Sequence, residues 1–261
     1  MGLCFNVLGS GSSGNSTLVS DGATNILVDA GLSGREIARR LDEFGLSPEK
    51  LSAIVVSHDH GDHCRGVAPL VKNLDIPVFM TGTAFEASGI KVNPSKLRVI
   101  SPGECFEIGN IAVTCFSVPH DAADPVGFVL EKNGVRVGIA MDLGFMSNLV
   151  VERLKGCAGI VLESNHDVTM LKAGPYPWAL KQRVMSRSGH LSNDAVAQYL
   201  AGDFDGTAAH MVLAHLSKQN NLPDLALLSA QRALEERSGM CAIQTKLELA
   251  WADKISKTYR Y

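Results

Sequence analysis

The stretch HDHGDHC, residues 58–64, follows the apolar run AIVVS and is rich in groups that can bind metals. It contains His58, Asp59, His60, Asp62 and His63. Imidazole and carboxylate groups at this density would lose hydration and repel one another if they were buried without a partner. A divalent cation removes that penalty because the same groups become its ligands. The stretch therefore predicts a metal site, with donors that suit zinc and also manganese or iron.

Further polar side chains follow apolar runs later in the chain. His120, Asp142, Glu163 and His215 each stand near the end of a predicted strand. Residues that are distant in sequence can meet where strand ends gather along one edge of a sheet. We therefore expect them to share one site with the 58–64 stretch. Alternation along a strand also predicts that His58 and His60 point the same way.

Apolar strand-like runs alternate with helical patterns along the chain, which predicts an α/β protein. Ser33 and Glu36 have the spacing of a helix-capping box. The residues between the first two predicted strands, glycine- and serine-rich at their start, are expected to form a loop. Strands are predicted at 3–9, 25–31, 51–58, 76–82, 208–217 and within 156–167 and 241–249; hairpins within 106–120 and 125–144; and helices at 33–45, 65–74, 192–202 and 224–239.

Composition limits the classes of function. The chain has 261 residues, of which 46% are hydrophobic and 20% charged, as in an ordinary globular protein. No apolar stretch approaches the ~20 residues of a membrane helix, and the N-terminus lacks the basic start of a signal peptide. We therefore expect a cytoplasmic protein that does not bind membranes, in which the six scattered cysteines are small buried hydrophobic residues. Oligomeric state is left open.

A local basic segment stands out against the net charge of −3. No acidic residue occurs from Val168 to Asn193, and basic residues lie there beside Tyr176 and Trp178. Such a mixture is typical of surfaces that bind phosphates and stack bases. A solvated helix face would have the same composition, so both interpretations stay open. The basic residues are Lys172, Lys181, Arg183 and Arg187.

The motif SHDHGDH, followed in order by SVPHD, AMDLG and LAHLSKQNN, resembles the signature of the metallo-β-lactamase fold. The resemblance covers nearly the whole chain and implies an αββα sandwich, two mixed sheets flanked by helices. It implies a single domain, 1–261, without the inserted β-CASP domain of some nucleases. It further implies two divalent metal ions, zinc or manganese: one held by His58, His60 and His120, the other by Asp62, His63 and His215, with Asp142 bridging them.

The motifs GSGSSGNST, ESNHD and GHLSN narrow the resemblance to the WalJ/YycJ-type bacterial DNA nucleases. This subfamily implies a 5′-exonuclease on double-stranded DNA, with DNA favoured over RNA. A metal-activated hydroxide, oriented by Asp62, would attack the phosphodiester. A histidine held charged by a carboxylate can protonate the leaving oxygen, and Glu163 and His190 match that pair. Residues expected to contact the substrate are Ser13, Asn15, His166, Lys181 and Arg183.

Two alternatives remain at this stage. The same fold supports hydrolysis of small thioesters or lactones, which would need a closed apolar pocket rather than a basic segment. The glycine-rich loop at residues 9–17 either lines the rim of the active site or is a structural turn that satisfies its own backbone. It is not a Walker A loop, since it lacks the Gly-Lys-Ser/Thr ending.

Overall fold

The structure is a computed structural model that describes residues 2–238 and 243–261. Cys241, one of the predicted buried cysteines, lies outside the described residues. The chain folds into two compact units. Unit 1 comprises Met1–Ser117, Ala122–Val135 and Trp251–Tyr261, and unit 2 comprises Val118–Asp121 and Arg136–Ala250. None of the helices in the described ranges combines the length and apolar character needed to cross a membrane.

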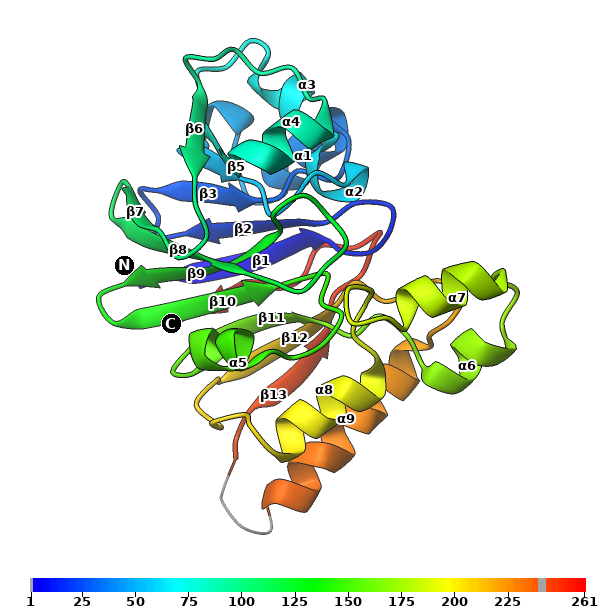
Figure 1. The fold of residues 1–261 in the computed structure, drawn as a ribbon. Coiled ribbons are helices and arrows are strands. Elements are labelled where there is room, and N and C mark those ends of the chain that lie inside the picture. The colour runs from blue at the N-terminus through cyan, green and yellow to red at the C-terminus, as the bar shows by residue number, and fades with distance from the viewer. Residues whose placement is uncertain (1, 239–242) are drawn as a thin grey trace. The chain divides into compact units, whose positions relative to one another are not determined.

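Unit 1 contains a mixed seven-stranded sheet (Figure 1). The pairs formed by β14, β1, β2 and β3 are antiparallel, and those formed by β3, β4, β5 and β6 are parallel. The parallel pairs require crossover connections, which contain the helices of this unit. In sheet order the strands are β14 (Tyr259–Arg260), β1 (Cys4–Gly9), β2 (Ser16–Ser20), β3 (Asn25–Val28), β4 (Ala53–Val55), β5 (Val78–Thr81) and β6 (Leu97–Ile100).

The helices of unit 1 bury their apolar residues against this sheet. Ile37 and Leu41 of α1 pack in one core cluster with Leu27 of β3 and Ile54 of β4. The start of α1 is fixed as the sequence predicts, because Ser33 Oγ accepts from the Glu36 N–H at 3.2 Å. The helices are α1 (Gly34–Asp42), α2 (Gly61–Cys64), α3 (Val67–Val71) and α4 (Gly82–Ser88), with a 3₁₀ turn at Pro48–Lys50.

Arg40 of α1 is a buried cation in unit 1, with 4% of its surface exposed. Its guanidinium donates to Glu36 at 2.6 Å, to the carbonyl of Ala252 at 3.1 Å and to the carbonyl of Leu8. We predict that Arg40→Ala lowers the free energy of unfolding by about 2–4 kcal/mol, because these acceptors would lose their donors. Chemical denaturation measures the loss.

Arg39→Ala is the matched control for that prediction. The Arg39 side chain is 55% exposed and pairs with Glu36 and Glu43 on and just beyond the same helix. Exposed helix pairs contribute little, so the change should cost less than about 1 kcal/mol. Equal losses for the two variants would contradict a structural role of the buried guanidinium.

The remaining strands form a second seven-stranded sheet in the order β13-β12-β11-β10-β9-β8-β7. In unit 1, β7, β8 and β9 are antiparallel. In unit 2, β10 to β13 are parallel. The strands are β7 (Cys105–Ile108), β8 (Ile111–Ser117), β9 (Val126–Lys132), β10 (Val135–Ala140), β11 (Gly159–Glu163), β12 (His210–Ala214) and β13 (Lys246–Leu249).

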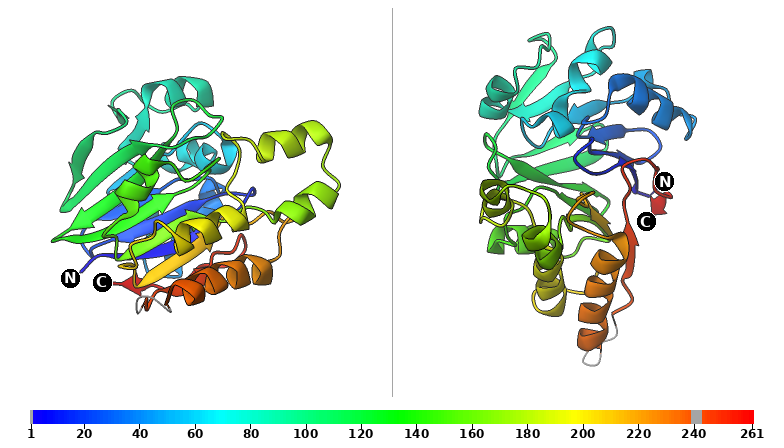
Figure 2. Two further views of the ribbon diagram at one scale, coloured as in Figure 1. Left: turned by 60° about the horizontal axis from the view of Figure 1, so that its bottom comes forward. Right: turned by 90° about the vertical axis from the view of Figure 1, so that its right-hand side faces the viewer.

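The helices of unit 2 follow its parallel strands. The two longer ones, α8 and α9, lie side by side (Figure 2), and α6 and α7 project away from the rest of the unit (Figure 1). They are α5 (Asn148–Leu154), α6 (Val168–Ala173), α7 (Trp178–Val184), α8 (Asn193–Ala201) and α9 (Pro223–Ser238). Ser192 caps α8, as one of its two predicted caps, by accepting from the Ala195 N–H at 3.1 Å.

Two mixed sheets with flanking helices confirm the predicted α/β class, but three local predictions are wrong. Cys105, expected to be buried, begins β7 and is exposed. The expected loop between the first two predicted strands contains β2, in which Ser16 Oγ donates to the Asp29 carbonyl at 2.8 Å and Ser20 Oγ to Asn25 at 2.7 Å. These bonds allow hydroxyl-bearing residues to occupy a buried strand. The strand predicted at 51–58 ends at Val55, so His58 and His60 lie beyond it.

Candidate metal and proton-transfer site

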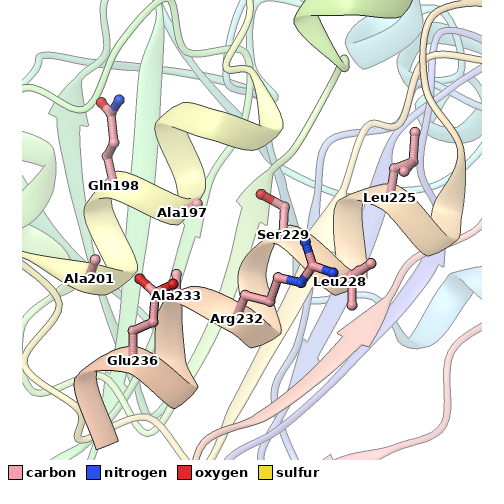
Figure 3. Close-up of a pocket in the computed structure, with 9 residues that line it drawn as sticks. All are labelled: Ala197, Gln198, Ala201, Leu225, Leu228, Ser229, Arg232, Ala233 and Glu236. Atoms are coloured by element: carbon pink, nitrogen blue, oxygen red, sulfur yellow. The ribbon is translucent and has the colours of Figure 1, made fainter. Parts of the chain in front are cut away.

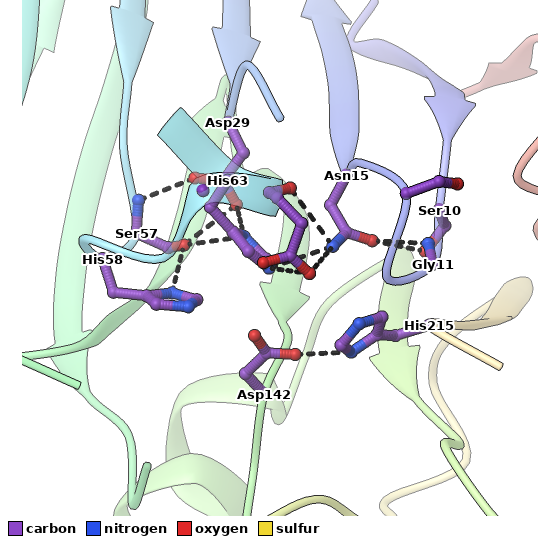
Figure 4. A network of polar contacts seen from close by, with 12 residues as sticks. Ser10, Gly11, Asn15, Asp29, Ser57, His58, His63, Asp142 and His215 are labelled. Atoms are coloured by element: carbon purple, nitrogen blue, oxygen red, sulfur yellow. Dashed lines mark hydrogen bonds and ion pairs between the residues drawn. The ribbon is translucent and has the colours of Figure 1, made fainter. Parts of the chain in front are cut away.

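A polar network in unit 1 fixes the orientation of His63 (Figure 4). Asp29 follows β3 and is buried, and its carboxylate accepts from the Ser57 N–H at 2.7 Å and from Ser57 Oγ at 2.9 Å. His63 Nδ1 lies 2.8 Å from the same carboxylate. A carboxylate on one imidazole nitrogen sets the ring's tautomer and leaves Nε2 to bind a metal. Unit 1 therefore presents His63 with its orientation already set.

Two further imidazoles stand beside His63. The ring centre of His58 is 4.1 Å from that of His63 and 4.7 Å from that of His60. The Asp59 carboxylate binds the backbone instead, because its Oδ1 accepts from the Ala123 N–H at 2.8 Å. The loop after β4, rather than strand alternation, therefore brings His58 and His60 together.

The glycine-rich loop between β1 and β2 is fastened to this cluster through Asn15. Its Oδ1 accepts from Ser10 Oγ at 3.0 Å and from the Gly11 N–H at 2.8 Å, and its Nδ2 lies 2.9 Å from His63 Nε2 (Figure 4). The Asn15 N–H also donates to the Asp62 carbonyl at 2.8 Å. Ser13 is exposed, and its carbonyl accepts from Arg65. The loop thus lies against the histidine-rich stretch.

Unit 2 gathers acidic and imidazole groups where its parallel strands end. Glu163 ends β11 and is fully buried. Its Oε1 lies 2.7 Å from His190 Nδ1 and 3.0 Å from His215 Nδ1. Its Oε2 accepts from the N–H groups of Leu143 at 2.6 Å and Leu191 at 3.1 Å. One carboxylate therefore orients two imidazoles, while two backbone donors hold the carboxylate itself.

Asp142 lies beside this pair. Its Oδ1 is 2.5 Å from His215 Nδ1 (Figure 4) and 3.6 Å from His190 Nδ1, and its Oδ2 is 3.7 Å from His120 Nε2. Asp142 and His215 have positive φ angles, 54° and 56°, which non-glycine residues seldom adopt. Such conformations cluster at sites whose surroundings hold them in place.

Burial and neighbouring charge set the protonation states in unit 2. Burial alone would lower the pKa of His190, but the Glu163 carboxylate outweighs it and raises this pKa above its usual value. Burial alone would raise the pKa of Glu163, yet His190 and then His215 hold it below its usual range. Burial lowers the pKa of His120. An ionised Glu163 beside a readily protonated His190 is the arrangement that donates a proton near neutral pH.

The same residues can bind a cation. One donor atom from each of Asp142, Glu163, His190 and His215 lies within 4.8 Å of the other three. Carboxylate oxygens and imidazole nitrogens are donors that divalent zinc or manganese accepts. The side chains present therefore fit a divalent metal. Glu163 and His190, predicted for proton transfer, belong to this group of possible ligands as well.

The predicted substrate-contacting residues of unit 2 occupy different settings. His166 is buried, and burial lowers its pKa to about 4. Lys181 is also buried and donates to the Lys172 carbonyl at 2.7 Å. Arg183 is exposed and pairs with Asp121 at 2.5 Å. Lys181 and Arg183 therefore hold α7 in place in addition to any contact with substrate.

A groove elsewhere in unit 2 is a poor candidate for the catalytic site. It runs between α8 and α9 and is lined by residues such as Leu225, Leu228, Arg232 and Glu236 (Figure 3). None of the predicted site residues lines it, and its lining contains no histidine or cysteine. It lacks the groups that bind metals or transfer protons.

Sequence reasoning missed two residues that the network in unit 1 depends on. Asp29 stands directly after the apolar run NILV, the same signal that pointed to Asp142 and Glu163. Ser57 precedes the first histidine and has no pattern of its own. The signal for Asp29 was present in the sequence, whereas the role of Ser57 appears only once the loop after β4 is folded.

Comparison with known proteins agrees with this fold. A model of the β-lactamase superfamily domain matches residues 24–216, and the chain belongs to that superfamily. Among its relatives, Exodeoxyribonuclease YycJ of Bacillus anthracis is 37% identical over 240 residues, covering 91% of each chain. Exodeoxyribonuclease WalJ of Streptococcus pneumoniae is 34% identical over 241 residues, covering 90% of each. The predicted resemblance to WalJ/YycJ-type proteins is confirmed.

Solved structures match over nearly the whole chain. The metallo-β-lactamase fold protein YhfI from Bacillus subtilis has a TM-score of 0.72 at 17% identity and covers 98% of this chain and 99% of its own. The short form of human tRNase Z has a TM-score of 0.64 at 17% identity, covering 97% and 98%. At these identities the likeness establishes the fold alone.

Proposed function

We propose that the protein is a metal-dependent exodeoxyribonuclease that hydrolyses phosphodiester bonds of double-stranded DNA from the 5′ end, in the cytoplasm. Identities of 37% and 34% to exodeoxyribonucleases over about nine-tenths of the chain support it. The observation that carries the proposal is the 2.7 Å contact between His190 Nδ1 and buried Glu163. A phosphodiesterase must protonate an alkoxide leaving group, and this pair provides the acid.

The proposal includes two divalent ions, zinc or manganese, and a single metallo-β-lactamase domain formed by both units without a β-CASP insertion. His58, His60 and His120 would hold one ion and Asp62, His63 and His215 the other, with Asp142 between them. When bound, such ions activate water and neutralise charge that develops on the phosphate. The donor chemistry of the unit 2 group and the preset orientation of His63 support this assignment.

Side chains of the protein would donate the proton, orient the acid and orient the attacking water. His190 presents Nδ1 to Glu163, so the proton for the leaving oxygen is carried on Nε2. Glu163 keeps the imidazole charged and oriented, and it is held in turn by the N–H groups of Leu143 and Leu191. Asp62 would orient the attacking water. Ser13, Asn15, His166, Lys181 and Arg183 are proposed contacts to the DNA backbone.

Digestion of duplex DNA labelled at one end tests the function. With zinc or manganese present, we expect stepwise release of nucleotides from the 5′ end and no such products from a duplex whose 5′ ends are closed by hairpins. A duplex RNA of the same sequence should be digested more slowly. Wild-type protein that cleaves a thioester, but neither nucleic acid nor bis(p-nitrophenyl) phosphate, would overturn the proposal in favour of a small-molecule hydrolase.

A further inference from the structure

The two short helices α6 and α7, residues 168–184, form a hairpin that projects from the rest of unit 2 (Figures 1 and 2). Trp178, the first residue of α7, has 63% of its surface exposed. A single exposed aromatic side chain is common on protein surfaces, so its meaning depends on the groups beside it. We call this element the α6–α7 hairpin.

The charges on the hairpin favour a polyanion over a protein surface of mixed charge. No carboxylate side chain occurs between Val168 and Asn193. Lys172 of α6 is exposed, as is Arg187, three residues after the hairpin, whereas Arg183 is paired with Asp121. The guanidinium of Arg187 lies 3.9 Å from the ring centre of Phe145, which orients it. Lys181 Nζ ties α7 to the Lys172 carbonyl of α6, so the hairpin is braced internally. A rigid basic element with an exposed aromatic ring suits stacked bases and phosphates.

Short segments of chain connect the two ends of the hairpin to Glu163 and to His190. On the side of Glu163, Asn165 donates to the Leu191 carbonyl at 2.8 Å, and Asn193 donates to the His166 carbonyl at 2.9 Å. At the end of α7, the His190 N–H donates to the Val184 carbonyl at 2.9 Å. Val184 lies six positions after Trp178, a rise of about 9 Å along a helix. Stacked nucleotides repeat every ~3.4 Å along a strand, so this span equals about three nucleotides.

We propose that the α6–α7 hairpin grips the nucleic-acid strand beside the cleavage site, with a base stacked on Trp178 and phosphates near Lys172 and Arg187. This inference rests on the proposed nuclease function. The α6–α7 hairpin would then favour strands several nucleotides long over small phosphodiesters.

The test compares two substrates in the metal-loaded protein. For Trp178→Ala, the ratio of kcat/KM for a 20-base-pair duplex to kcat/KM for bis(p-nitrophenyl) phosphate should fall about 5- to 150-fold, the loss expected for one stacked base. Lys172→Glu should lower the same ratio and reduce the salt dependence of DNA binding by about one phosphate contact. Trp251→Ala is the matched control, because Trp251 is the other tryptophan of the chain, is 39% exposed and belongs to unit 1.

Fluorescence gives a readout that does not depend on turnover. In Trp251→Phe, Trp178 is the one remaining tryptophan, and a duplex with hydrolysis-resistant phosphorothioate linkages should quench its emission. No quenching and an unchanged substrate ratio in Trp178→Ala would overturn the inference while wild-type DNA digestion leaves the proposed function intact. A change of oligomeric mass in Trp178→Ala with an unchanged ratio would also overturn it, and would assign the hairpin to protein contact. Wild-type inertness toward DNA and RNA would remove both proposals together.

Discussion

Replacing His190 with alanine should lower kcat for duplex DNA by about 10²- to 10⁴-fold, the usual contribution of a general acid. The loss for bis(p-nitrophenyl) phosphate should be much smaller, because p-nitrophenolate is a stable anion that leaves without a proton. The prediction follows from the contact of His190 with buried Glu163 and from the raised pKa of His190. Steady-state rates on the two substrates provide the measurement.

Metal content must be measured on the same His190→Ala sample, since His190 also belongs to the group of four possible ligands. If His190 is the general acid, the variant should keep its metal content, and its loss of rate should depend on the leaving group. If His190 is instead a metal ligand, the variant should bind less metal and lose rate equally on both substrates, a result that would contradict the acid role. His210→Ala is the matched control, because His210 is also an imidazole of unit 2 but begins β12, at the opposite end of that strand from the site residue His215. It should match the wild type in rate and metal content.

Asp142→Ala should remove detectable activity on every substrate and lower the amount of metal that copurifies with the protein. Asp142 has carboxylate oxygens within 3.7 Å of nitrogens on His120, His190 and His215, so its loss removes one carboxylate from beside all three imidazoles. Inductively coupled plasma mass spectrometry of dialysed protein measures the metal.

Removal of metal from the wild type by a chelator should lower its thermal midpoint, since a ligand that binds the folded state stabilises it.

Asp59→Asn is the control for Asp142→Ala. Asp59 lies within the histidine-rich stretch, but its carboxylate accepts from the Ala123 N–H. Its amide variant should keep the wild-type metal content, with at most a small loss of stability. Full metal binding by Asp142→Ala, or equal metal loss in Asp59→Asn, would refute the assignment of Asp142 as a ligand.

The sequence predicted those parts of the site that chain-local rules determine. Asp142, Glu163 and His215 were expected at strand ends, and β10, β11 and β12 are parallel neighbours that bring such ends to one edge. Glu163 and His190 were expected to pair, and the hydrogen bond exists. These predictions worked because an apolar run followed by a polar residue marks where a buried strand meets a site.

Other features depended on contacts that no local pattern encodes. The alternation argument for His58 and His60 failed because β4 ends at Val55, and the loop after it sets their orientation. A solvated helix was one interpretation of the basic segment, but the two separate helices α6 and α7 were not predicted, since the GPYPW run at their junction has two prolines and a glycine that interrupt helical periodicity. Lys181 was expected to face solvent and substrate, yet its ammonium reaches a carbonyl of the neighbouring helix.

The backbone bonds that join Asn165 to Leu191 and His166 to Asn193 close a small ladder at the base of the α6–α7 hairpin. Residues 168–184 lie between the two sides of that ladder and form α6 and α7, outside the strands of the sheet. This position is therefore a natural point for evolutionary divergence in substrate length or shape. A transplant of residues 168–184 between relatives offers a way to exchange preference while the proton-donating chemistry stays with the host.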